Sequence, residues 1–344
     1  MRRRAQLAPF PGRAWRSAYS DDVRARVPAS TANLGPGFDA LALALDLYVE
    51  VEVEPSSRLV VRSEGEGAGL SDDAGHLAAR VAMDVAGHDQ LAITVRSQIP
   101  IARGLGSSAA LSVAAAAAAG SPDPLAVAAR MDGHAENAAA SLGGGLVAAT
   151  LVKGAVRSVQ LALDPVLAFV VMVPDRPLPT TRARQVLPTR VSREDAAFNL
   201  GRMGLLLAGL ADHNVLTKEA TEDRLHQDYR SPLFPEAPML LAALLEAGAK
   251  AVCWSGAGPS LLGICVESSA RDVRDAASAA MGAHGVPGHA LLLHADRRGM
   301  VTGETARLSM APTIVSEEDV TRLAGDARPA PTPGGPLFDF DEDG

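Results

Sequence analysis

The stretch Pro100-Ile-Ala-Arg-Gly-Leu-Gly-Ser-Ser-Ala-Ala110 decides the fold, and a nearly unbroken alanine run to Ala119 follows it. Alanine is the strongest helix former, so the run predicts a helix that begins near Ser107. Gly104 and Gly106 permit backbone conformations that other residues disfavour, which predicts a tight turn before the helix. A helix N-terminus has free N–H groups and a partial positive charge. The stretch therefore predicts either a phosphate-binding loop or a turn capped by serine.

Two familiar nucleotide-binding patterns do not fit this loop. A Walker A loop is excluded because no Gly-Lys-Ser/Thr follows the glycines. The dinucleotide pattern GxGxxG is excluded because its third glycine is missing. Ser107 and Ser108 add hydroxyl donors, and either one could instead be a ligand for a phosphate-bound magnesium ion.

Two further segments complete a recognisable set. Pro28-Ala-Ser-Thr-Ala-Asn-Leu-Gly-Pro-Gly-Phe-Asp39 precedes the loop, and Trp254-Ser-Gly-Ala-Gly-Pro-Ser260 follows it. In order and spacing, the three segments resemble the three motifs of the GHMP small-molecule kinases. The first segment differs from the homoserine kinase pattern PASSANLGPGFD only at Thr31, so the chain is most similar to that family. The resemblance covers roughly Val23 to Ser309, which is nearly the whole globular part of the chain.

The pattern between the termini predicts an α+β protein with two domains. Val49–Glu54 alternates strictly, which predicts a strand with its valines buried and its glutamates in water. Leu167–Val173 is a continuous apolar run, which predicts a central strand. The resemblance implies the two-domain GHMP kinase fold, with an N-terminal ribosomal-protein-S5-like domain and a C-terminal ferredoxin-like domain. The other predicted elements are strands over 91–95, 251–254 and 261–266 and helices over 107–119, 125–131, 196–211 and 238–247.

We predict four segments along the chain. The N-terminal ATP-binding domain spans 21–165, and the C-terminal domain spans 166–310. Residues 1–20 mix Arg, Pro, Gly and Ser without periodicity, which predicts a disordered extension, although a start codon assigned too early would look the same. Residues 311–344 become rich in Pro and Gly and end in acidic residues, which predicts a disordered acidic tail.

Composition limits the partners of the protein. The chain has 344 residues and a net charge of −8, which argues against non-specific nucleic-acid binding. No apolar run approaches the roughly 20 residues that span a bilayer, so we expect no membrane partner. Cys253 and Cys265 lie in apolar runs and are predicted to be reduced core residues. The basic start Met1–Arg4 has no hydrophobic segment behind it, so it is not a secretory signal. These features predict a cytoplasmic protein.

The resemblance also implies a substrate site for L-homoserine. Asp39 would bind the ammonium group, with Asn33 at the same end. A carboxylate calls for arginine, whose planar fork binds both oxygens. The family pattern Thr-x-x-Ala-Arg-x-x-Leu-Pro selects Thr180 and Arg184, and a second family arginine falls at Arg230. The residues predicted to bind L-homoserine are Asn33, Asp39, His134, Asn137, Thr180, Arg184, Arg230, Gly256 and Gly258.

The segment Asp132-Gly-His-Ala-Glu-Asn-Ala138 resembles the family's Glu-Gly-His-Pro-Asp-Asn but differs at Asp132, Ala135 and Glu136. Both acids remain, each changed in length by one methylene. Asp132 would reach the ATP-bound magnesium, and a shorter side chain could act through water, which magnesium tolerates. Glu136 and Asn137 would lie at the substrate hydroxyl. The predicted catalytic residues are Ser108, Asp132, Glu136 and Asn137, and the predicted magnesium ligands are Ser108 and Asp132.

The cofactors implied by the resemblance are ATP and Mg²⁺. Arg103 could touch a phosphate or be merely exposed, and both interpretations stay open. The residues predicted to bind ATP are Pro100, Ile101, Ala102, Arg103, Gly104, Leu105, Gly106, Ser107, Ser108, Ala109 and Ala110.

The leading hypothesis is an ATP-dependent kinase that phosphorylates the hydroxyl of L-homoserine in threonine biosynthesis. One alternative is another GHMP kinase, acting on mevalonate, a sugar or a related alcohol. Opposite charges at Asp39, Arg184 and Arg230 favour an amino acid over those substrates. The other alternative is a non-catalytic nucleotide-binding relative, which loss of the loop serines or the acids would favour. The family also suggests a homodimer.

Overall fold

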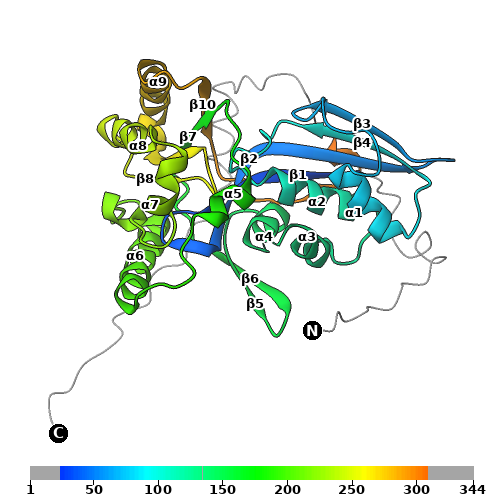
Figure 1. Ribbon diagram of the computed structural model, residues 1–344, viewed down its shortest axis with the longest axis horizontal. Coiled ribbons are helices and arrows are strands. Elements are labelled where there is room, and N and C mark those ends of the chain that lie inside the picture. The colour runs from blue at the N-terminus through cyan, green and yellow to red at the C-terminus, as the bar shows by residue number, and fades with distance from the viewer. Residues whose placement is uncertain (1–23, 134, 309–344) are drawn as a thin grey trace, which may run out of the picture. The chain divides into compact units, whose positions relative to one another are not determined.

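The computed structural model describes residues 24–133 and 135–308, so the predicted terminal segments 1–20 and 311–344 lie outside the described residues. The described chain forms two β-sheets with helices packed on them, which confirms the α+β prediction (Figure 1). None of its helices combines the length and the apolar character needed to cross a membrane.

The first sheet has the strand order β11-β1-β2-β4-β3, and β5 pairs with both β2 and β6. Only β3 and β4 run parallel among its described pairs. Its strands are β1 (Arg24–Asn33), β2 (Gly37–Pro55), β3 (Val60–Gly65), β4 (Leu91–Ser97), β5 (Leu146–Val152), β6 (Ala155–Leu161) and β11 (Val301–Thr302).

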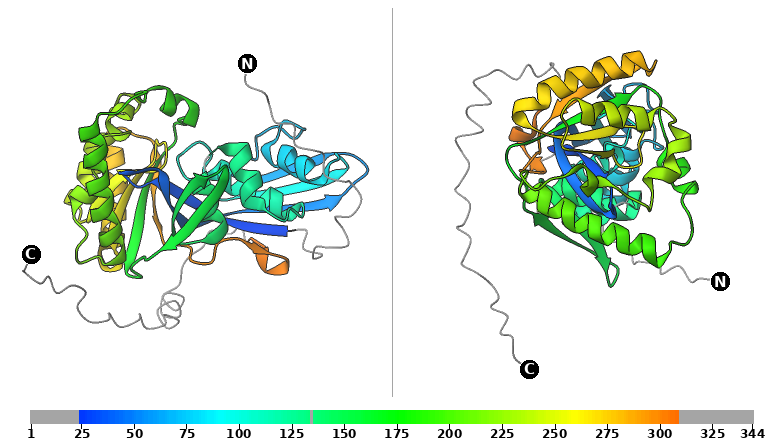
Figure 2. Two further views of the ribbon diagram at one scale, coloured as in Figure 1. Left: turned by 90° about the horizontal axis from the view of Figure 1, so that it is seen from below. Right: turned by 90° about the vertical axis from the view of Figure 1, so that its left-hand side faces the viewer.

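Four helices pack on this sheet (Figure 2). The central one, α2, contacts β1, β2 and the three other helices, so it is enclosed on nearly every side. Its alanines explain how it fits there, because a small side chain lets neighbouring backbones approach closely. These helices are α1 (Leu77–Ala86), α2 (Ser107–Ala118), α3 (Pro124–Asp132) and α4 (Ala135–Gly143).

The second sheet is antiparallel, with the order β10-β7-β9-β8. Every residue of β7 is buried, as its continuous apolar run predicted. The strands are β7 (Leu167–Pro174), β8 (Ala251–Trp254), β9 (Leu261–Val266) and β10 (Gly288–Leu293). The helices and short 3-10 turns around it are α5 (Thr180–Gln185), α6 (Arg193–Ala211), η1 (Lys218–Thr221), α7 (Gln227–Arg230), η2 (Ser231–Leu233), α8 (Ala237–Glu246) and α9 (Glu267–Ala283).

One of the buried apolar clusters joins the two sheets. A single cluster of buried apolar side chains includes Leu45 of the first sheet and Phe169 of the second. After β10 the chain returns to the first sheet, where β11 pairs with β1 and is followed by η3 (Glu304–Ala306). The segment predicted as the C-terminal domain therefore also adds a strand to the first sheet.

One detail of the predicted strand over Val49–Glu54 is wrong. The valines are buried, but Glu50 is also fully buried rather than solvated. Arg96 donates a 2.7 Å hydrogen bond to one Glu50 oxygen, and the backbone N–H of Leu308 donates to the other. Arg24 lies 3.5 Å from the same carboxylate. A buried carboxylate is tolerated here because cations and donors surround it.

Candidate active site

The glycine loop requires its glycines for two reasons. Gly104 and Gly106 have φ values of +76° and +64°, which side chains disfavour. A Cβ at Gly104 would lie 2.1 Å from the carbonyl oxygen of Ser255, and one at Gly106 would lie 2.2 Å from Ser30 Oγ. Gly106 is the N-cap of α2, and as a glycine it has no side chain to cap the helix. The N–H groups of the first turn of α2 are therefore open to an anion.

The guanidinium of Arg103 binds backbone carbonyl oxygens. It donates to the backbone carbonyls of Ile101 and Pro174 at 2.7 Å each, and also to that of Asp175. This side chain therefore ties the start of the loop to the end of β7. A cavity of about 340 Å³ is lined by Pro100–Arg103 and by Leu70.

The three sequence motifs meet at Ser255. Its hydroxyl lies 2.7 Å from the carbonyl oxygen of Gly104 and 2.9 Å from Thr31 Oγ1. The next residue, Gly256, donates its N–H to the carbonyl of Ala32 at 3.0 Å. Trp254 and Leu261 are paired in β8 and β9, so the segment between them is the turn of a β-hairpin.

Asn33 braces this junction. Its Nδ2 donates to the carbonyl of Gly256 at 2.8 Å, and its Oδ1 accepts the backbone N–H of Asp39 at 3.0 Å. Asn33 is buried and has a φ of +71°, a conformation that asparagine tolerates better than most residues. The amide therefore holds Asp39 at the end of a strained turn and joins it to the third motif.

Asp39, Arg184 and Arg230, which the resemblance assigns to the two ends of the substrate, lie close together around Phe38. Arg184 binds Asp39 through both terminal nitrogens, at 2.6 and 3.1 Å. The guanidinium carbons of Arg184 and Arg230 lie 5.8 and 5.7 Å from the centre of the Phe38 ring. Arg230 is buried, and this burial, together with the charge of Arg184, lowers the pKa of Arg230 to about 10.

A chain of hydrogen bonds orients Asn137. Ser141 donates to Ser30 Oγ at 3.3 Å, and Ser30 donates to Asn137 Oδ1 at 2.9 Å. Asn137 Nδ2 then donates to the Glu136 carboxylate at 3.1 Å. Glu136 is buried at the start of α4, and its partner Asn137 lies close to Gly106. The predicted catalytic pair therefore lies beside the glycine loop.

The remaining predicted residues divide into two groups. Thr180 is exposed at the first position of α5, and Gly258 packs against the Trp254 ring. The side chain of Asp132 and the whole of His134 lie outside the described residues.

Sequence reasoning missed His226, which is fully buried four residues before Arg230. Its Nδ1 accepts from Arg230 Nη1 at 2.9 Å, and its Nε2 lies 2.8 Å from the carbonyl oxygen of Gly35. The ring stacks on Phe38 with centroids 5.2 Å apart. The signal was available, because positions four apart on a helical turn lie on the same face.

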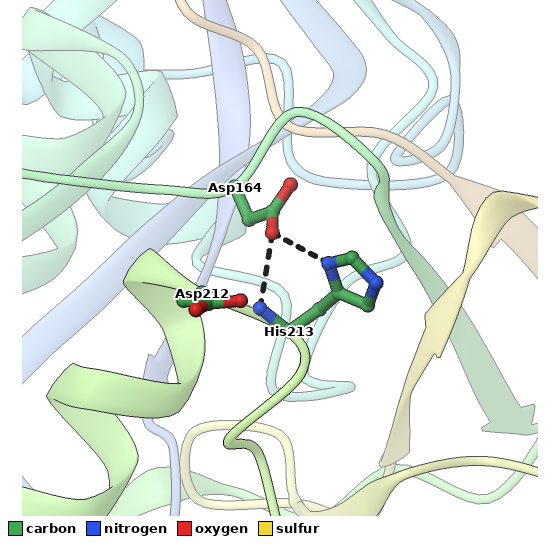
Figure 3. Close-up of side chains that lie close together, drawn as sticks. All are labelled: Asp164, Asp212 and His213. Atoms are coloured by element: carbon green, nitrogen blue, oxygen red, sulfur yellow. Dashed lines mark hydrogen bonds and ion pairs between the residues drawn. The ribbon is translucent and has the colours of Figure 1, made fainter. Parts of the chain in front are cut away.

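A second polar cluster lies where the linker after β6 meets the end of α6 (Figure 3). Asp164 accepts from the backbone N–H of His213 at 3.0 Å and from its Nδ1 at 2.7 Å. Partial burial raises the pKa of Asp164, but the hydrogen bonds from His213 together lower it by more. The pKa of Asp164 therefore lies below its ordinary value. Asp212 Oδ1 accepts from the backbone and side chain of Asn214. These carboxylates thus stabilise the turns that carry them.

The fold and the glycine loop define a GHMP kinase. A model of the GHMP kinases N terminal domain matches residues 74–154, and a model of the GHMP kinases C terminal domain matches residues 196–283.

Individual relatives indicate which family of GHMP kinases the chain belongs to. Homoserine kinase of Moorella thermoacetica is 41% identical over 255 residues, which is 70% of this chain and 86% of the relative. Homoserine kinase of Streptomyces avermitilis is 42% identical over 280 residues, covering 76% and 90%. The crystal structure of homoserine kinase from Cytophaga hutchinsonii superimposes with a TM-score of 0.72 at 25% identity, covering 83% of this chain and 99% of that one. The chain belongs to the homoserine kinase family.

Proposed function

We propose that this protein transfers the γ-phosphoryl group of ATP to the hydroxyl of L-homoserine and forms O-phospho-L-homoserine, a step toward threonine. Family membership supports the reaction. The observation that carries the substrate assignment is the convergence of one carboxylate and two guanidinium groups, at Asp39, Arg184 and Arg230. A free amino acid has one ammonium and one carboxylate, so it can satisfy both signs of charge at once.

The Asp39–Arg184 ion pair sharpens this argument. The two side chains neutralise each other in the structure, so a ligand that separates them must replace both interactions. A zwitterion can do so, whereas an alcohol with a single charge would leave one group without its partner. We infer that substrate selection acts on the pair of charges and not on either charge alone.

We propose that ATP places its phosphates at the N-terminus of α2. The uncapped first turn and the two glycines without room for a side chain support this site. Phosphoryl transfer requires mainly alignment and neutralisation of charge. Glu136 and Asn137, fixed by the chain from Ser141, would orient the acceptor hydroxyl of homoserine beside the loop.

We propose that Ser108 and Asp132 hold Mg²⁺ with the nucleotide. A hydroxyl and a carboxylate are hard oxygen ligands, the type that magnesium prefers, and half-buried Ser108 lies in the first turn of α2. The ion would neutralise charge on the phosphates. Ser108→Ala with Asp132→Asn should reduce turnover on the order of 100-fold or more. Turnover measured against magnesium concentration, with circular dichroism as the folding control, tests this pair. Wild-type turnover at every magnesium level would contradict it.

The proposed reaction is tested by coupled measurement of ADP release with ATP, magnesium and a panel of acceptors. Homoserine should give the highest kcat/KM, ahead of serine, threonine and mevalonate. A higher kcat/KM for mevalonate would establish the alternative GHMP kinase, and no turnover with any acceptor would favour the non-catalytic relative. Likeness to the mevalonate kinase of L. major, with a TM-score of 0.59 and 16% identity, concerns the fold alone.

We further propose a cytoplasmic homodimer. Both cysteines are free and buried, which fits a reducing compartment. Among the described strands β6 pairs only with β5, and Leu151 and Val159 of this hairpin are 64% and 60% exposed. An open strand edge with apolar side chains is suited to contact a second copy. Light scattering should give twice the mass of the chain, and Val159→Lys should lower it.

A further inference from the structure

The buried imidazole of His226 lies between two groups of the candidate site that come from opposite ends of the chain. On one side is Arg230, which is assigned to the substrate carboxylate. On the other is Gly35, in the turn that leads to Asp39. The ring is fully buried, so water cannot substitute for either partner.

The two partners fix the proton on the ring. A guanidinium has only donors, so the Nδ1 atom that faces Arg230 must be the unprotonated acceptor. A backbone carbonyl only accepts, so the Nε2 atom that faces Gly35 must carry the hydrogen. The imidazole is therefore neutral and in the Nε2–H tautomer. Burial is the main reason that the pKa of His226 falls to about 4, with the nearby Arg230 charge acting in the same direction and Asp223 opposing it.

The surroundings hold this ring in one orientation. Asp223 accepts the backbone N–H groups of His226 and Gln227 at 2.8 Å each and so fixes the turn that begins α7. Phe38 stacks on the imidazole face at an interplanar angle of 25°. Arg230 has two further acceptors, the carbonyls of Gly256 at 3.0 Å and Ala183 at 3.4 Å. His226 is the only side chain among these three acceptors.

We propose that His226 is a positioning residue for homoserine binding: its Nδ1 aims the Arg230 guanidinium at the substrate carboxylate, and its Nε2–H fixes the turn before Asp39. The inference rests on the proposed function. It predicts that the ammonium and carboxylate sites are aligned with each other through one imidazole.

Two isosteric variants separate the two contacts. In His226→Asn the amide oxygen takes the place of Nδ1 and can still accept from Arg230. In His226→Gln the amide nitrogen takes the place of Nε2 and can still donate to Gly35, but the acceptor for Arg230 is lost. We expect His226→Gln to raise the KM for homoserine about 10- to 100-fold with the KM for ATP within twofold of wild type. His226→Asn keeps the acceptor for Arg230 but loses the donor to Gly35, so it should raise the KM for homoserine less, about 2- to 10-fold, again with the KM for ATP within twofold of wild type. A KM for homoserine that is unchanged in either folded variant, or a KM for ATP that rises as much as that for homoserine, would overturn the positioning role.

The wild-type enzyme provides the readout that does not depend on a variant folding. Nitrogen-15 spectra of the imidazoles at neutral pH should contain one buried Nε2–H tautomer, identified by its loss in either His226 variant that folds, or otherwise by its contact with Phe38. A charged ring or an Nδ1–H tautomer at this position would also overturn the proposal. Wild-type protein that does not phosphorylate homoserine would instead refute the proposed function, while the tautomer would still be measured.

Discussion

Arg184 and its neighbour Arg182 test how far a single side chain decides substrate binding. Both lie on α5, but only Arg184 forms the bidentate pair with Asp39 among the described residues. A lost hydrogen bond between charged groups costs roughly 1.5–3 kcal/mol, or about 10- to 150-fold. Arg184→Ala should raise the KM for homoserine by that factor and change the KM for ATP little. Steady-state kinetics should show a near wild-type Arg182→Ala, and an unchanged KM for homoserine with a normal kcat in Arg184→Ala would remove Arg184 from the site.

Gly106 provides a second test at the residue scale. Alanine there must adopt a positive φ, and its Cβ would displace Ser30 Oγ, which is the donor to Asn137. Gly87 also has a positive φ, of +76°, but a Cβ there meets nothing within 4 Å. Both alanine variants should lose about 1 kcal/mol of unfolding free energy through the backbone. Only Gly106→Ala should also lose turnover, on the order of 100-fold. Similar turnover in the two variants would show that Ser30 can move away from the new Cβ without loss of catalysis.

Motif positions predicted which residues gather at the site, but not what their atoms contact. Whether Arg103 touches a phosphate or is exposed was left open, and its guanidinium binds three backbone carbonyls. Asn33 was placed with the substrate, and both ends of its amide hold backbone groups. These partners are main-chain atoms distant in sequence, so no side-chain pattern announces them.

At the scale of the element, two glycines of α6 allow a matched pair of alanine variants. Gly201 faces open space, whereas a Cβ at Gly209 would lie 2.7 Å from Leu216 Cα. Helix propensity alone should make Gly201→Ala more stable by roughly 0.5–1 kcal/mol. Gly209→Ala should be less stable by about 1–3 kcal/mol, because Leu216 is held by the backbone and cannot rotate away. Urea unfolding measures both, and a stabilising Gly209→Ala would show that the loop carrying Leu216 yields readily.

Elements were predicted well where one hydrophobic periodicity dominates. The environment of a side chain was predicted poorly where residues on neighbouring strands determine it. The helix predicted over 196–211 is α6, and the strand over Leu167–Val173 is β7. The alternation around Glu50 gave the right strand and the wrong environment for that carboxylate. Its cations, Arg24 and Arg96, lie on the strands at either side of β2, and strand pairing cannot be obtained from alternation alone.

At the scale of the molecule, the site exists because two sheets hold three motifs together. The hairpin of the second sheet contacts Thr31 and Gly104 through one serine, although more than 150 residues separate it from the loop. Physical reasoning from the sequence did not predict this contact, because both segments appear locally as glycine turns. Return of the chain to the first sheet in β11 was not foreseen either, since two residues are too few for a periodic signal.

The contact between the sheets also has a pH-sensitive part. His294, just after β10, lies 3.4 Å from Asp46 of β2 and 2.9 Å from Glu267 at the start of α9. The bond to Asp46 is the main cause that raises the pKa of His294 to about 9, with Glu267 adding to it against partial burial. A folded pKa above the unfolded value, near 6.5, means that the protonated pair stabilises fully below about pH 6.5. That stabilisation is lost as the pH rises through about 9.

His294→Gln should therefore be destabilising at pH 6 and nearly neutral above pH 9.5. Because the imidazole is partly exposed, solvent screens the interaction and the effect at pH 6 should be modest. Urea unfolding of wild type and variant at both values measures the difference in unfolding free energy, and Glu267→Gln in both backgrounds completes a double-mutant cycle. The coupling energy between His294 and Glu267 should shrink as the pH rises. A coupling that is constant from pH 6 to pH 9.5 would mean that the ring makes only a neutral hydrogen bond between α9 and β2.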